Sequence, residues 1–223
     1  MTSKQVPLPI QTRDPYSERF LIRHSGNIAA FTELESHLEM HRQSPETFSC
    51  LYLFGPAGSG KTHLAEVFRE KARSSVPQVP FELFEVPEGV DADHDDESWA
   101  APIVSTYERM KSGGGILIFL SRVAPGDATS NPHVSSRLLA GRVLELGFPQ
   151  ESEFRAVIDS LIERHNMKLS DYSVDYMLRR LPRKPLSFDS IFARISEFSL
   201  AESKPPGLGV IRSVIEETTK GHR

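Results

Sequence analysis

The stretch LYLFGPAGSGKTHL, residues 51–64, decides the fold, because an apolar run leads into a glycine-rich turn and then into Gly60-Lys61-Thr62. Residues 55–62 match G-x-x-x-x-G-K-[ST], the pattern of a phosphate-binding loop between a strand and a helix. Glycines let the backbone curl until its N–H groups point inward, and the helix adds its positive N-terminus. Lys61 would bring a charge to the β- and γ-phosphates, and the Thr62 hydroxyl would be a ligand for Mg²⁺.

The residues on either side of this loop supply the context that the pattern requires. FSCLYLF before it is typical of a buried strand, and KTHLAEVFREKARSS after it is typical of a helix. The alternative is a chance glycine turn, which needs neither neighbour. We therefore expect ADP or ATP with Mg²⁺ to be bound by Gly55, Pro56, Ala57, Gly58, Ser59, Gly60, Lys61, Thr62 and His63.

The composition is that of an ordinary globular protein of 223 residues, with 25% charged and 39% hydrophobic residues. The formal net charge is -4, and this lack of a basic excess gives no support for DNA binding. The single cysteine, Cys50, excludes an internal disulfide and fits a reducing cytosol, so we expect a cytoplasmic protein. The N-terminus has no signal-peptide core and no apolar run is long enough to span a membrane.

Strand and helix patterns alternate up to about residue 147. The expected strands are FSCLYLF, PFELFEV, ILIFL and residues 143–146. One helix is indicated by Ile28, Phe31, Leu34 and Leu38, and another, from Trp99 to Met110, is expected to stop at Gly113-Gly114-Gly115. His37 and His41 are spaced four apart on the first of these helices, and we interpret them as part of a solvated face. The stretch DADHDDES is interpreted as a solvated loop.

After Pro149 the pattern is helical throughout, with four apolar stripes between Phe154 and Ile215. The fold class predicted is therefore α/β, a P-loop core with a parallel sheet followed by a small all-helical lid domain. We place an extended arm at residues 1–15, the nucleotide-binding domain at 16–148 and the lid at 149–223.

Several segments in this order resemble the AAA+ module of the bacterial replication initiator DnaA. They are YSERFLIRHSGN, GKTHL, ILIFLSRVAPGD, NPHVSSRLLAGRVLEL, LSDYSVDYMLRRLPRKPLSF and RISEFSLAE. The resemblance runs from about residue 16 to the C-terminus and is strongest to the short Hda paralogues, which act in the regulatory inactivation of DnaA. It implies an adenine-nucleotide-binding AAA+ protein whose partners are DnaA and the DNA polymerase sliding clamp, with self-association as a further expectation.

The resemblance also assigns roles to individual residues. Tyr16, Phe20 and Ile22 match the segment that lines the adenine pocket, with packing against the first helix as the alternative. Ser121 occupies the sensor-1 position, or is only a turn serine at a strand end.

The resemblance also assigns roles to two arginines. Arg137 matches the arginine of the SRL signature, which acts as an arginine finger on a neighbour's nucleotide, with a surface salt bridge as the alternative. Arg183 matches the sensor-2 arginine of the lid, and Arg180 is its rival.

The sequence departs from the AAA+ pattern at the acidic strand motif. An ATPase needs a pair of carboxylates, one for the Mg²⁺ shell and one to activate water. The strand in the right place, FELFEVPEG, offers only Glu85 or Glu88 as a remnant. Between the helix after the phosphate-binding loop and Phe81 there is too little chain for the extra strand and helix that AAA+ proteins usually have there. We therefore expect a sheet of about four strands. We therefore expect nucleotide binding without efficient hydrolysis.

The N-terminal arm contains KQVPLPI, in which Gln5, Leu8 and Pro9 resemble the short peptide that docks on the sliding clamp. Prolines pre-extend the backbone and lower the ordering cost of binding. DnaA continues into a helix-turn-helix domain for which this chain has no equivalent segment, so we expect no sequence-specific DNA binding. The leading hypothesis is a regulator that promotes hydrolysis of DnaA-bound ATP. Alternatives are an adaptor that only binds partners, a loader that hydrolyses its own ATP, and a small-metabolite kinase.

Overall fold

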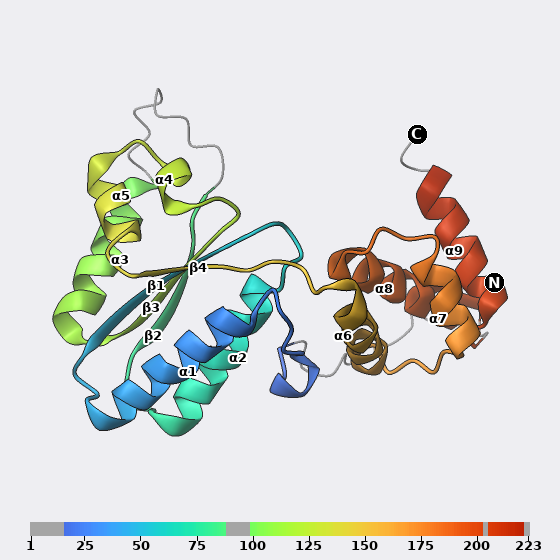
Figure 1. The fold of residues 1–223 in the computed structure, drawn as a ribbon, viewed down its shortest axis with the longest axis horizontal. Coiled ribbons are helices and arrows are strands. Elements are labelled where there is room, and N and C mark those ends of the chain that lie inside the picture. The colour runs from blue at the N-terminus through green and yellow to red at the C-terminus, as the bar shows by residue number, and fades with distance from the viewer. Residues whose placement is uncertain (1–15, 88–98, 203–204, 221–223) are drawn as a thin grey trace, which may run out of the picture. The chain divides into compact units, whose positions relative to one another are not determined.

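The computed structural model describes residues 16–87, 99–202 and 205–220, which divide into two compact units (Figure 1). The sheet unit runs from residue 23 to 150, and the helical unit combines the described residues up to 22 with those from 151 onward. Gln5, Leu8 and Pro9, which the sequence analysis predicted to bind the clamp, lie outside the described residues, as do Glu88 and the acidic stretch DADHDDES. The observed boundary at 150 is close to the predicted one at 148.

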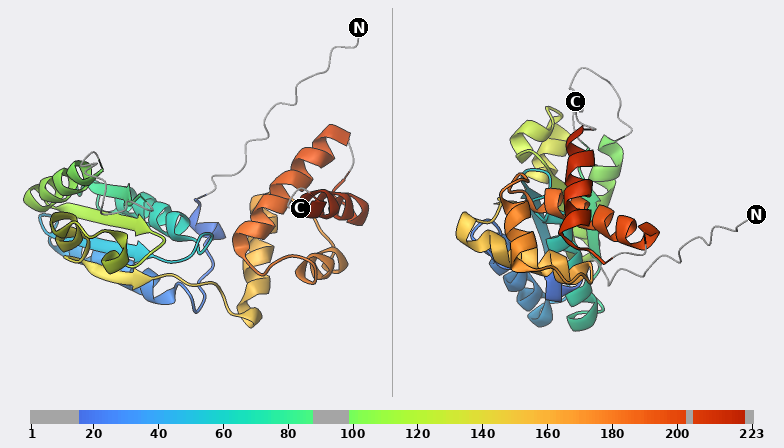
Figure 2. Two further views of the ribbon diagram at one scale, coloured as in Figure 1. Left: turned by 90° about the horizontal axis from the view of Figure 1, so that it is seen from above. Right: turned by 90° about the vertical axis from the view of Figure 1, so that its right-hand side faces the viewer.

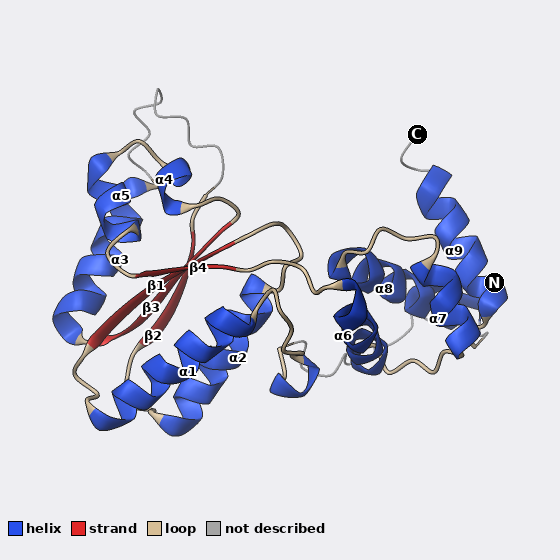
Figure 3. Ribbon diagram, in the orientation of Figure 1, coloured by secondary structure: helices blue, strands red, loops and turns tan. Residues whose placement is uncertain are grey.

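The sheet unit contains one sheet with the strand order β2-β3-β1-β4, and every pair of neighbours is parallel (Figure 3). Its strands are β1 (Phe48–Phe54), β2 (Phe81–Glu85), β3 (Gly115–Ser121) and β4 (Arg142–Glu145). Strands β1 and β3 lie in the centre and are buried on both faces, which explains why their sequences are continuous apolar runs. The predicted short parallel sheet is confirmed for the described part of the chain.

Helices cover both faces of this sheet, so the unit has three layers, with the sheet in the middle (Figures 1 and 2). On one face lie α1 (Ile28–Gln43) and α2 (Lys61–Ser75), and on the other lie α3 (Ala100–Gly113), α4 (Pro125–Ala128) and α5 (Pro132–Leu138). Phe31 of α1 and Phe68 of α2 meet edge to face at 5.1 Å between ring centroids. Helix α3 ends where the glycine run predicted, because Gly114 caps it with a φ of 76°.

The two histidines of α1 are not on a solvated face, so that interpretation was wrong. His41 is 0% exposed and its Nε2 lies 2.9 Å from the Ser49 hydroxyl oxygen. His37 is partly buried and its Nδ1 lies 2.9 Å from the same oxygen. The spacing of four does put both rings on one helix face, but that face meets the N-terminal half of β1.

The helical unit is built from α6 (Glu151–Arg164), α7 (Asp171–Leu178), α8 (Pro185–Glu202) and α9 (Leu208–Lys220), as the four apolar stripes predicted. Its core contains Phe154, Ile158, Val174, Met177, Phe188, Ile191, Phe192, Ile195, Val210, Ile211, Val214 and Ile215. No helix in the described ranges has the length and apolar character needed to cross a membrane.

Residues 16–22 group with the helical unit, whereas the sequence analysis placed them in the nucleotide-binding domain. They include the short 3-10 helix η1 (Glu18–Phe20). The reason is local contact with α6: Phe20 is buried, its carbonyl oxygen accepts a hydrogen bond from Ser160 Oγ at 3.0 Å, and Arg19 forms an ion pair with Glu163. The segment that contains Phe20 thus contacts α6.

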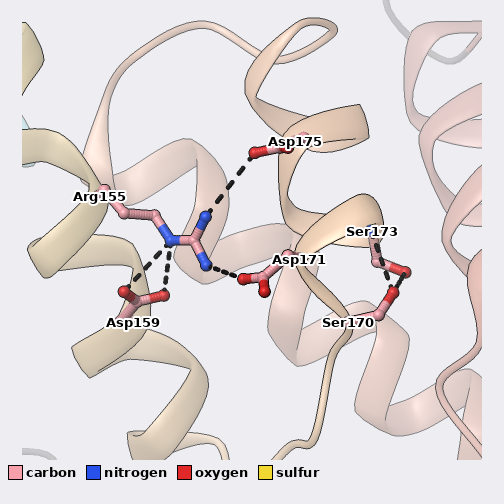
Figure 4. A network of polar contacts seen from close by, with 6 residues as sticks. All are labelled: Arg155, Asp159, Ser170, Asp171, Ser173 and Asp175. Atoms are coloured by element: carbon pink, nitrogen blue, oxygen red, sulfur yellow. Dashed lines mark hydrogen bonds and ion pairs between the residues drawn. The ribbon is translucent and has the colours of Figure 1, made fainter.

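A network of charged side chains joins α6 and α7 (Figure 4). Arg155 donates from Nε to Asp159 at 2.9 Å and from a terminal nitrogen to Asp171 at 2.5 Å, and it lies 3.7 Å from Asp175. The Ser170 hydroxyl caps α7 by accepting from the Ser173 N–H. Because these groups are solvent-exposed, each ion pair contributes little, about 0.2–1 kcal/mol.

Candidate nucleotide-binding site

The phosphate-binding loop lies at the carboxyl edge of the sheet, after β1 and before α2. Two glycines are required there by geometry. Gly55 has a φ of 149°, and a Cβ at this position would lie 2.0 Å from the carbonyl oxygen of Leu146, the residue after β4. Gly60, the N-cap of α2, has a φ of 89°. The strand-loop-helix context predicted from residues 51–64 is therefore present.

Lys61 folds back over this loop. Its Nζ donates to the carbonyl oxygens of Gly55 at 2.7 Å and of Pro56 at 3.0 Å. These contacts fix the ammonium beside the loop backbone, at the first residue of a fifteen-residue helix whose first turn contains no acidic residue. A cation and a helix N-terminus in one place favour a bound anion.

The loop residues fit a nucleotide phosphate. The hydroxyl oxygen of Ser59 is buried and has no hydrogen-bond partner in the protein. Buried polar atoms usually have such a partner, and a bound phosphate could supply it here. Residues Lys61, Thr62 and His63 form the first helical turn and are partly exposed. No cluster of three or more His, Cys, Asp or Glu that could hold a metal occurs in the described part of the chain. If Mg²⁺ were bound with a nucleotide, the phosphates and the Thr62 hydroxyl would hold it.

Strand β3, beside β1, and strand β2, beside β3, bring Ser121 and Glu85 to the same edge. Ser121 pairs with Phe54, the residue before the loop, and Glu85 pairs with Leu120 on the next strand. Ser121 is buried, and its hydroxyl oxygen accepts a hydrogen bond from the Val123 N–H at 3.2 Å. The other carboxylate of β2, Glu82, is bound by Arg109 at 2.6 Å, so Glu85 is the acidic side chain that β2 leaves at its carboxyl end.

One residue of this edge was not anticipated from the sequence. Tyr52, in the middle of β1, is 0% exposed and donates its hydroxyl proton to the Val123 carbonyl oxygen at 3.0 Å. The signal was available, because a tyrosine inside a buried apolar run must find a partner for its hydroxyl group. The partner lies in the loop after β3, which no local pattern could identify.

Arg137 lies near the end of α5, a helix that the sequence analysis did not predict. Its Nε and one terminal nitrogen donate to Glu108 of α3 at 3.2 and 2.8 Å, and the other terminal nitrogen donates to the His133 carbonyl oxygen at 3.0 Å. The side chain of Arg137 is 26% exposed and that of Glu108 is 50% exposed. The structure therefore supplies the ion-pair partner that the local sequence did not reveal.

The remaining predicted residues belong to the helical unit. Arg183 forms an ion pair with Glu151, and Arg180 lies over the Tyr176 ring with 5.1 Å between its guanidinium carbon and the ring centroid. Phe20 is buried, Ile22 is partly buried and Tyr16 is 40% exposed. Their proposed contacts with a nucleotide stay predictions.

No protein-family model and no curated protein matches the sequence, whereas solved structures do match the fold. Domain III of the replication initiation protein DnaA from Thermotoga maritima is similar with a TM-score of 0.73, 13% identity, and coverage of 92% of this chain and 98% of that domain. AMPPCP-bound DnaA from Aquifex aeolicus gives a TM-score of 0.62 and 16% identity, covering 83% of this chain and 66% of the other.

The Holliday junction branch migration motor RuvB from Thermotoga maritima is also similar, with a TM-score of 0.58 and 16% identity over 89% of this chain and 73% of the motor. At these identities the likeness concerns the fold. The chain thus has a DnaA-like AAA+ fold, a four-stranded parallel sheet with flanking helices and a helical C-terminal portion.

Proposed function

We propose that the protein binds an adenine nucleotide at residues 55–63 and acts as a regulator of replication initiation. The observation that carries the first part is the loop itself. Its glycine conformations, the Lys61 ammonium held against the loop, and the uncapped N-terminus of α2 together form a phosphate-binding arrangement. The likeness to AMPPCP-bound DnaA supports the adenine nucleotide.

Calorimetry tests this binding. Lys61→Ala removes the charge that neutralises the β- and γ-phosphates, so Mg-ADP and Mg-ATP binding should become undetectable. Lys168→Ala, at an exposed lysine of the helical unit, is the matched control and should bind like wild type. Wild-type affinity in Lys61→Ala would remove the loop from the site.

Hydrolysis by the protein itself should be slow. Strand β2 presents one carboxylate, Glu85, at its carboxyl end, where an efficient ATPase uses two. The nucleotide would therefore have a structural role. When bound, Mg²⁺ would shield the phosphate charges, while Lys61, Thr62 and the loop N–H groups hold the phosphates in place.

The regulatory part of the proposal concerns DnaA and the sliding clamp. In this hypothesis Gln5, Leu8 and Pro9 dock on the clamp and Arg137 reaches the ATP bound by DnaA. The likeness of the fold to DnaA domain III supports the choice of partner. To act, Arg137 must exchange its contacts with Glu108 and the His133 carbonyl oxygen for the nucleotide.

A reconstituted assay tests this hypothesis by following ADP formation in a mixture of ATP-bound DnaA, DNA-loaded clamp and this protein. Arg137→Ala should reduce the stimulation at least about 10-fold, as expected for loss of an arginine finger, and Glu108→Gln should preserve or raise it. Arg109→Ala, on the same helix as Glu108, is the control and should stimulate normally. The double variant Gln5→Ala with Leu8→Ala should no longer bind the clamp, so the clamp-dependent stimulation should be lost.

The outcomes separate the candidates. If wild type gives no stimulation, the regulator hypothesis is wrong, and a DnaA-like adaptor is the function that the fold then favours. If wild type and Arg137→Ala stimulate equally, the protein is a regulator and Arg137 is not its finger.

A further inference from the structure

Strand β2 forms one edge of the sheet, and among the described residues β3 is its only strand partner. The Val86 N–H, just after β2, points toward β3 and donates to the Leu120 carbonyl oxygen at 2.8 Å. Successive residues of a strand direct their backbone groups to opposite sides, so the N–H and C=O groups of Phe81, Leu83 and Glu85 point away from β3. The outer side of β2 therefore offers a row of donors and acceptors to an added strand.

The side chains and the flanking residues define the length of this edge. The strand reads Phe-Glu-Leu-Phe-Glu, and its first four residues are only partly buried although three of them are apolar. Pro80 and Pro87 lie on either side of β2, and proline cannot extend a hydrogen-bonded ladder because it has no N–H group. A short apolar edge with fixed ends suits a closed pair of strands and not an open fibre.

The order of residues in β2 makes the strand complementary to itself. In an antiparallel pair with a two-fold axis at Leu83, this leucine faces its own copy and each glutamate faces a phenylalanine. Every outward N–H then meets an outward C=O, because Phe81 pairs with Glu85 of the second copy. A parallel pair in register would put glutamate beside glutamate, and a shift by two residues would do the same or shorten the overlap. Like charges directly opposite each other are destabilising, so the glutamates select the two-fold register.

We propose that the outer edge of β2 binds the same edge of a second copy of this chain, which joins two sheets across a two-fold axis. A second copy fits better than an unrelated extended peptide, because β2 complements itself in both charge and hydrogen bonding. Glu82 does not oppose the pairing, since its carboxylate is already bound by Arg109 at 2.6 Å. Strand β3 separates β2 from β1 and its phosphate-binding loop, and the pairing needs no nucleotide.

Sedimentation velocity of the full chain tests this pairing. The mass should rise from the 25.0 kDa of one chain toward twice this value as the concentration increases from about 1 μM to about 1 mM. Leu83→Lys removes the leucine pair and puts two like charges opposite each other, so it should raise the dissociation constant at least about 10-fold. Val143→Lys changes an exposed valine of β4, the opposite edge strand, and is the matched control that should associate like wild type.

A mixture of two variants locates the axis. Leu83→Glu should also associate poorly alone, because two glutamates would then face each other on the axis. An equimolar mixture of Leu83→Lys and Leu83→Glu should regain association, because a lysine of one copy then faces a glutamate of the other. A contact elsewhere on the surface would not respond to this exchange of charges.

Amide hydrogen exchange on the wild type needs no variant, so it decides the matter even if the Leu83 variants do not fold. The N–H groups of Phe81, Leu83 and Glu85 should exchange more slowly at the higher concentration, because the second copy then binds them. The exchange of the Val143 N–H, on the opposite edge, should not depend on concentration.

The outcomes separate this inference from the proposed function. Lys61→Ala should lose nucleotide binding and keep the association, so either property can fail without the other. A wild type that stays at the mass of one chain overturns the inference and leaves the edge to an extended peptide of another protein. Association that Leu83→Lys does not weaken, or that Val143→Lys weakens equally, also overturns it.

Discussion

His37 and His41 share the hydroxyl group of Ser49, and this arrangement should make the stability of the sheet unit depend on pH. One hydroxyl can donate to one ring and accept from the other, so both rings are satisfied while neutral. Burial lowers the pKa of both histidines. Glu33 raises the pKa of His37 and Arg142 of β4 lowers it, while a charged His37 lowers that of His41.

The sign of the pH effect follows from these lowered pKa values. Below the pKa of an unfolded histidine, about 6.5, the unfolded chain binds protons that the folded chain resists. Stability should therefore be complete above about pH 6.5 and fall as the pH decreases below it, by at most about 1.4 kcal/mol per pH unit for each proton. Thermal melting between pH 7.5 and pH 5.5 measures this loss.

His41→Gln preserves a polar partner for Ser49 and removes one titrating group, so it should flatten the loss of stability at low pH. His133→Gln is the control, because His133 is an exposed residue of α5. Equal slopes for wild type and His41→Gln would show that these histidines do not set the pH dependence.

Individual residues also show the limits of reading the sequence. The spacing of His37 and His41 placed both rings on one helix face correctly, but it could not tell which face meets the sheet. Their partner Ser49 is a polar residue within an apolar run, and a helix near in sequence can cover either side. In the same way Glu108, the partner of Arg137, is 29 residues away along the chain and could not be found from local sequence.

At the scale of elements, apolar runs were sufficient to predict the strands of the described sheet, and apolar periodicity was sufficient for the long helices. The central strands β1 and β3 read as continuous apolar runs because both of their faces are covered. Helix α5 was missed because it has only seven residues and contributes just Val134 and Leu138 to the core. Its start was nevertheless encoded: Asn131 accepts from the N–H groups of His133 and Val134, and Pro132 occupies the first turn.

For the same reason, some parts of the candidate site could be predicted from the sequence and others could not. The loop at residues 55–62 is a local motif, so its strand, turn and helix could be predicted together. The hydrogen bond from the Tyr52 hydroxyl to the Val123 carbonyl oxygen joins β1 to the loop after β3, and these two segments are neighbours only because of the sheet. Sequence patterns could indicate that β1 and β3 are both buried, but their adjacency depends on the strand order β2-β3-β1-β4.

At the scale of the whole molecule, the division into two units assigns Phe20 to the helical unit. This chain segment is separated from α6 by about the whole length of the sheet unit, yet Phe20 is 6% exposed and its carbonyl accepts from Ser160. The structure divides the chain after residue 150, and the sequence analysis placed the boundary after residue 148. The sequence analysis did not reveal that a segment before the sheet unit completes the unit after it, because that contact is not local.

Phe20→Ala should therefore destabilise the helical unit selectively. Removing a buried phenylalanine ring costs about 3–5 kcal/mol, from lost burial and from the cavity that remains. Hydrogen exchange should accelerate in α6 and α8, while the amides of β1 and β3 stay protected, because those strands have a core of their own. Tyr16→Ala, in the same segment but 40% exposed, should change exchange much less. Loss of protection in β1 and β3 without change in α6 would contradict this assignment.

Calorimetry with Mg-ADP on Phe20→Ala separately tests the adenine pocket, since an unchanged affinity would exclude Phe20 from it.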